Sequence, residues 1–216
     1  DEALAVRELT PQQREIRDGD FQVQRAAGQQ AAEQVQEALD SSAWAQTVLT
    51  AAVSDVEAAL DNAQKCEEQH QKLKNDPRKG TAVSYTLGYH QQQLQLKQQA
   101  DAWFNEAVGV AEKVMSSIDS ALERVVKAAQ GVTSAAEPLL ALARKPEHQV
   151  RAEKAKQQAS QAEQAVRGVP DAVRQAKRKV AHAKDDRDVR GLVAAVAEVQ
   201  SAVAQASQGC GTVFQA

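Results

Sequence analysis

The strongest pattern in the sequence is an unbroken alternation of apolar positions three and four residues apart. Its members are Ala100, Phe104, Ala107, Ala111, Val114, Ile118, Ala121, Val125, Ala128, Val132, Ala135, Leu139 and Leu142. A heptad pattern of this length is typical of a long helix packed against other long helices. It predicts a helix over residues 85–144, in which Pro138 introduces a kink, because the pattern keeps its phase across that residue.

A second stripe with the same spacing lies upstream. Its members are Val35, Ala38, Ser42, Ala45, Leu49, Ala52, Val56, Ala59, Ala63, Cys66, His70 and Leu73, and it is widened by Leu39, Val53 and Leu60. Thr10 and Pro11 suit a helix start, and residues 75–80 combine Asn, Asp, Pro and Gly as a turn does. The sequence therefore predicts a first helix over residues 11–74.

A third helix is predicted over residues 146–208, after a turn at residues 143–146. Gly168 and Pro170 indicate a kink in it. The charged residues 184–188 then shift the apolar pattern by several positions, which indicates a local distortion or a short loop.

Three alanine-rich segments of similar length, joined by two short turns, have to fold back on one another. Aromatic residues make up only 3% of the chain, and small side chains let helices approach closely. The fold class predicted is therefore all-α: an elongated antiparallel three-helix bundle, up-down-up, with a kinked or interrupted third helix. Residues 1–216 are expected to form one such domain.

Charge and motifs argue against several function classes. Residues 144–190 hold 13 basic and 7 acidic side chains, whereas the net charge of the whole chain is −3. The basic cluster at residues 174–179 suits anionic glycans or nucleic acid, but without interleaved aromatic residues a solvated helix face is the better interpretation. There is no phosphate loop, nucleophile elbow or zinc-protease motif. We expect neither an enzyme nor a nucleic-acid-binding protein, and no cofactor.

The two cysteines have two interpretations. In an up-down-up bundle, Cys66 and Cys210 occupy inward positions near the same end, which predicts a disulfide between them and a secreted or surface protein. Two free buried thiols in a cytosolic protein are the alternative. Cys66 and His70 also have metal-ligand spacing, but with Cys210 they supply only three ligands, so no metal site is expected.

Aromatic residues that the bundle core does not need are candidates for a ligand-binding surface. Trp44 falls at an outward heptad position and Trp103 flanks the central stripe, while Tyr85, Tyr89 and His90 follow the first turn. The alternative is that both tryptophans are partly buried over grooves between helices.

The layout resembles a group of African trypanosome surface proteins. The group comprises the haptoglobin–haemoglobin receptor, the factor H receptor and the alanine-rich and glutamic acid/alanine-rich coat proteins. The resemblance rests on the three long alanine-rich segments, the turns at residues 75–80 and 143–146, and the pair Cys66 and Cys210. It implies an ectodomain on the outer face of the plasma membrane. It also implies a GPI anchor attached beyond Ala216 and a ligand-binding surface on the membrane-distal half.

Three functions are compatible with these observations. The first is a non-enzymatic cell-surface receptor for a host or environmental protein, or a passive coat protein. The second is an intracellular helical scaffold or adaptor that binds a partner helix. The third, a toxin or lipid-binding bundle, is disfavoured because the chain has no long apolar hairpin. The sequence has no apolar run long enough to span a membrane, so a membrane link is expected only through an anchor outside this chain.

Overall fold

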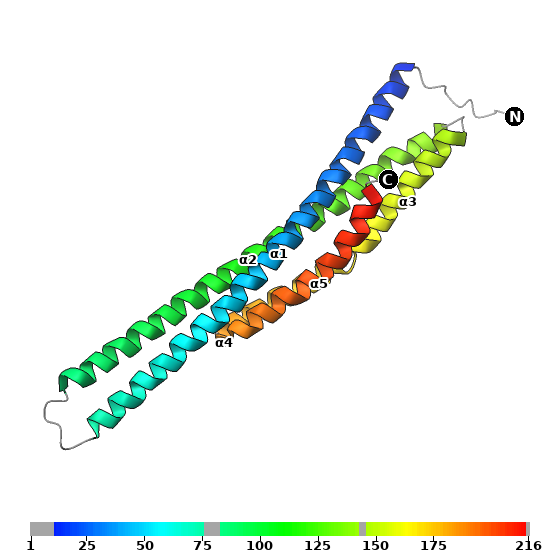
Figure 1. Cartoon of the computed structure of the whole chain (residues 1–216). Coiled ribbons are helices and arrows are strands. Elements are labelled where there is room, and N and C mark those ends of the chain that lie inside the picture. The colour runs from blue at the N-terminus through cyan, green and yellow to red at the C-terminus, as the bar shows by residue number, and fades with distance from the viewer. Residues whose placement is uncertain (1–10, 76–82, 143–145, 215–216) are drawn as a thin grey trace. The chain divides into compact units, whose positions relative to one another are not determined.

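The computed structural model describes residues 11–75, 83–142 and 146–214, and every element within these ranges is a helix. The helices are α1 (Pro11–Lys74), α2 (Val83–Leu142), α3 (Pro146–Val166), α4 (Val169–Asp186) and α5 (Val189–Phe214) (Figure 1). The prediction of an all-α fold is confirmed. The first two helices also have the bounds expected from the sequence to within two residues, and Pro138 lies inside α2 without ending it.

The predicted stripes form the core. On α2 the stripe is buried from Ala100 through Val132, and on α1 it is buried at Val35 and at most positions as far as Cys66. Leu60 is an exception, because 48% of it is exposed although it was expected to widen the buried stripe of α1.

The predicted third helix is interrupted twice. The first break follows Val166, where Arg167 and Gly168 form a turn before α4. In a continuous helix the ring of Pro170 would clash with the carbonyl of Val166, four residues earlier, and its nitrogen could not donate to that carbonyl. The chain instead starts a new helix, with the Ala172 amide bonded to the Gly168 carbonyl at 3.3 Å. The kink expected at Gly168 and Pro170 is thus a complete helix break.

The second break is a reversal of chain direction, which the sequence interpretation missed. Arg187 has a φ of 53°, and the amide of Asp188 bonds the carbonyl of Ala183 at 2.8 Å. A left-handed residue followed by this six-to-one bond is a Schellman motif, which closes the C-terminus of α4. The Leu192 amide then bonds the Asp188 carbonyl, so α5 starts at once. The chain after residue 146 thus forms three helices, and α5 runs back from the end of α4 (Figure 1). The expected interruption of the third helix is confirmed, whereas the three-helix, up-down-up arrangement is not confirmed.

Contacts divide the chain into two compact units. Unit 1 contains residues 1–41, 116–174 and 198–216, and unit 2 contains residues 42–115 and 175–197. Each unit therefore contains parts of α1, α2, α4 and α5, and unit 1 also contains α3. Whether residues 1–216 act as one ectodomain stays a prediction.

In unit 1, α5 contacts α1. The Ser207 hydroxyl donates to the Gln36 amide oxygen at 2.9 Å. On the other side of the unit, Lys156 of α3 pairs with Glu137 of α2 at 3.2 Å. Both contacts are exposed, so the buried apolar side chains supply most of the stability of this unit.

In unit 2, three exposed ion pairs surround the α4–α5 turn. Lys184 pairs with Glu112 at 3.3 Å and Arg187 with Asp101 at 2.5 Å, which places the end of α4 beside α2. The guanidinium of Arg190 donates to both carboxylate oxygens of Glu57, at 2.6 and 2.9 Å, which places the start of α5 beside α1. The hydrogen bond from Arg190 is the main reason that the pKa of the Glu57 carboxyl is lowered.

Candidate recognition surfaces

The five aromatic and histidine residues singled out from the sequence do not converge. Trp44 lies on α1, whereas Trp103, Tyr85, Tyr89 and His90 lie on α2. All five belong to unit 2. Thirteen positions separate His90 from Trp103 on one helix, which corresponds to about 20 Å of axial rise. The fold therefore does not bring these five residues together in a single ligand site.

Trp44 is the most exposed aromatic side chain in the described part of the chain. It is 62% exposed, and its sequence neighbours on α1 are small or polar. Thr47, one turn further on, uses its hydroxyl to bond the Ala43 carbonyl at 3.2 Å. The expectation of an outward tryptophan is confirmed for Trp44, whereas Trp103 is half-buried.

The end of unit 2 beyond the α4–α5 turn consists of α1 and α2 alone, over residues 58–74 and 83–100 (Figure 1). We call this segment the hairpin end. Three of the residues expected to bind ligand lie on it. Tyr89 is half-buried and His90 is exposed, while the side chain of Tyr85 lies outside the described residues. The ring of His90 is 5.5 Å from that of His70, across the two helices, with a tilt of 37°.

The hairpin end carries one buried polar side chain, Gln93, and a hydrogen-bonded carboxylate at Glu67. Gln93 is only 5% exposed. Glu67 accepts a hydrogen bond from Gln71 at 2.8 Å, which is the main reason that its pKa is lowered, and Gln93, His70 and Lys97 lower the pKa further. A carboxylate satisfied in this way stays ionised at neutral pH and is not suited to act as a general base.

The hairpin end also carries three exposed leucines. Leu60 of α1 and Leu87 and Leu94 of α2 are exposed by 48%, 56% and 46%. The sequence interpretation missed them, although the signal is present: Leu87 and Leu94 begin a heptad series that continues through Asp101 to Val108 and Met115. Val108 and Met115 are buried, and the change from exposed to buried falls at Asp101, where Arg187 ends α4.

Cys66 and Cys210 are free and buried. The predicted disulfide is thus absent from the structure, and the physical reason is the reversal at Arg187. Because α5 returns along α1, Cys210 lies in unit 1 with Gln36, whereas Cys66 lies in unit 2. Burial raises the pKa of the Cys210 thiol to about 11, so the thiol is protonated and unreactive at neutral pH.

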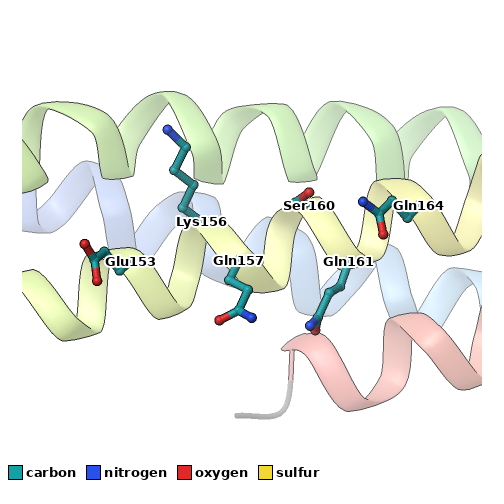
Figure 2. A pocket seen from close by; sticks show the side chains of 6 residues that line it. All are labelled: Glu153, Lys156, Gln157, Ser160, Gln161 and Gln164. Carbon is teal, nitrogen blue, oxygen red and sulfur yellow. The ribbon is translucent and has the colours of Figure 1, made fainter.

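An open hollow of about 440 Å³ lies on α3 in unit 1, lined by Glu153, Lys156, Gln157, Ser160, Gln161 and Gln164. Figure 2 shows Lys156 directed toward α2, and Gln157 and Gln161 on the opposite side of α3. The lining offers the Glu153 carboxylate, three amides, a hydroxyl and a lysine that is paired with Glu137, all of which can form hydrogen bonds with a ligand. No cluster of three or more metal-ligating side chains occurs among the described residues.

Comparison of the chain with family models, curated proteins and solved structures finds no match. None of the helices in the described ranges is both long and apolar enough to cross a membrane. The geometry of unit 2, with its exposed tryptophan and its exposed leucines, therefore provides the main basis for a functional proposal.

Proposed function

We propose that this protein is a non-enzymatic binding protein that acts as a cell-surface receptor for a host macromolecule or as a surface coat protein. The observation that carries the proposal is Trp44, which is 62% exposed and lies outside the buried stripe of α1. Tryptophan is among the residues most enriched at energetic hot spots of protein interfaces. Its large surface costs free energy when it is left in water, and a partner protein would recover that energy.

The cell-surface setting rests on the resemblance to the trypanosome group. The long alanine-rich helices α1 and α2 support that resemblance, whereas the free cysteines do not. A GPI anchor and a host ligand are parts of the same proposal. Surface biotinylation of intact cells that express the tagged full-length protein tests this setting, and a protein labelled only after lysis would contradict it.

Binding is tested by capture from host serum on the immobilised chain. We expect wild type to retain a ligand that Trp44→Ala loses by about tenfold or more, because truncating a hot-spot tryptophan costs at least about 2 kcal/mol. Val150→Ala is the matched control, since Val150 is 63% exposed but lies on α3 in unit 1. Equal capture by all three proteins, or no capture by wild type, would contradict the assignment to Trp44.

The free thiols favour a second function. Buried, unpaired cysteines are typical of proteins in reducing compartments, so an intracellular scaffold that binds a partner helix is the alternative proposal. The same biotinylation experiment separates the two settings. A partner that is a cytosolic helical protein, captured through Trp44, would favour the scaffold over the receptor.

A further inference from the structure

Trp44 lies in a stretch of α1 whose charged side chains are all negative. Residues 26–64 hold six acidic side chains and no lysine, arginine or histidine. Four of these side chains are separated from Trp44 by four, seven or eleven residues, which on a helix returns to within about 40° of the same direction. These four exposed residues are Glu33, Glu37, Asp40 and Asp55. They lie on the side of α1 that carries the indole, and we call them, together with Trp44, the acidic stripe.

The acidic stripe keeps its charge, whereas the other two acidic residues of the stretch are neutralised. Glu57 accepts two hydrogen bonds from Arg190, and Asp61 pairs with the lysine one turn further on at 2.5 Å. Within the described ranges the carboxylates of the stripe form no ion pair, and Asp40 accepts a hydrogen bond from the neutral Gln36 amide at 3.0 Å. Negative charge without an internal counter-charge therefore extends along about 33 Å of helix.

The combination of an exposed indole with these carboxylates suits a cationic partner. The face of a tryptophan ring attracts an ammonium or guanidinium group, and a carboxylate forms its strongest hydrogen bonds with the same groups. An acidic partner would be repelled by a row of charges of its own sign. An apolar partner would find Trp44 as the one large exposed apolar side chain of α1 between Val23 and Leu60. The charge of the stripe therefore selects a basic partner.

We propose that the partner bound at Trp44 is a protein segment rich in arginine and lysine. The proposal rests on the binding function assigned to Trp44 above and narrows its partner to a basic protein surface. Glu37, Asp40 and Trp44 follow one another at spacings of three and four residues, so they occupy about 10 Å of axial rise. One basic segment can contact all three, with a cation over the indole and one on each carboxylate. Glu33 and Asp55 extend the negative potential on either side and steer association.

The test is the fluorescence anisotropy of a fluorescein-labelled peptide of about six arginines, titrated with the full chain, with a glutamate peptide of the same length for comparison. We expect wild type to bind the arginine peptide and not the glutamate peptide. The stripe variant, Glu37→Gln/Asp40→Asn, should raise the dissociation constant of the arginine peptide by about tenfold. Trp44→Leu keeps an apolar side chain but removes the ring, and should raise it by about threefold. The matched control Glu147→Gln/Glu153→Gln removes two exposed charges of α3, changes the net charge by the same amount, and should bind as wild type does.

All of the substituted side chains are exposed, so every variant should keep the helical circular dichroism of wild type. Binding of the arginine peptide should weaken several-fold between about 50 and about 300 mM salt, because exposed charges are screened. Four outcomes overturn the proposal: no binding by wild type, equal affinity for both peptides, binding that survives the stripe variant, or binding that the control variant weakens to the same extent.

Capture from host serum separates this proposal from the proposed function. Serum protein that is lost with Trp44→Ala but retained by the stripe variant would leave Trp44 as a binding residue and overturn the basic partner. Conversely, arginine-peptide binding that depends on the stripe, together with no capture from serum, would support the basic partner and contradict the receptor function.

Discussion

The stability of the protein should depend on the ionisation of one buried thiol. Cys210 has no exposed surface, and burial raises its pKa from 9.0 to about 11. The folded state binds the proton more tightly than the unfolded state does. The stabilising contribution of the protonated Cys210 thiol is thus fully present below about pH 9 and is lost as the pH rises through about 11. A difference of two pKa units corresponds to about 2.7 kcal/mol of unfolding free energy once the thiol ionises in both states.

Urea unfolding followed by circular dichroism, from about pH 8 to about pH 11.5, measures this loss. Lysines and tyrosines also titrate over that interval, so the informative quantity is the difference between wild type and Cys210→Ala. The variant is less stable at pH 8 because it lacks the buried sulfur, but its free energy should fall less steeply at high pH. The difference in unfolding free energy between wild type and variant should therefore shrink by about 2–3 kcal/mol from the lowest to the highest pH. Parallel curves would refute the burial argument, and so would a wild-type protein in which Cys210 is already oxidised.

Two further predictions concern the cysteines and the glycines. Alkylation without reductant should modify both thiols in urea and neither rapidly in the folded protein, because both are buried; one disulfide-linked species by mass spectrometry would contradict this. Gly109→Ala should raise the unfolding free energy by up to about 1 kcal/mol, since a Cβ there meets no atom within 4 Å and alanine favours the helix. Gly191→Ala should lower the unfolding free energy or leave it unchanged, because the added Cβ would lie 2.7 Å from Asp188 Oδ2 and 3.1 Å from the Ala183 Cβ. A gain at Gly191 equal to that at Gly109 would mean that the start of α5 is looser than described.

The sequence predicted the helices better than their connections. The stripe from Ala100 to Val132 is buried as expected because heptad spacing directly determines which side of a helix meets its neighbours. The reversal at Arg187 was missed because the left-handed position is occupied by arginine, and only glycine or asparagine would have signalled it. The shifted apolar phase around residues 184–188 was noticed, but a phase shift alone does not distinguish a distortion from a change of direction.

The same omission affected the candidate sites. A third helix that continued past residue 188 would have brought Cys210 toward Cys66 and covered the hairpin end. Because the chain turns back instead, the cysteines are in different units and Leu60, Leu87 and Leu94 are exposed. The sequence contained one indication of this arrangement. The heptad series that ends in Val108 and Met115 begins with leucines, which predicts an apolar side extending beyond the helices that cover it.

The reversal at Arg187 is thus the central claim, and thiol cross-linking between α1 and α5 tests it most directly. Ser207 and Gln36 bond at 2.9 Å in unit 1, so Gln36→Cys/Ser207→Cys, in a chain with Cys66→Ala and Cys210→Ala, should be joined within one molecule by a short bifunctional thiol reagent. The natural pair, Cys66 and Cys210, should remain unlinked under the same conditions. Linkage of the natural pair, with none between positions 36 and 207, would instead indicate a third helix that continues past residue 188 and would contradict the fold described above.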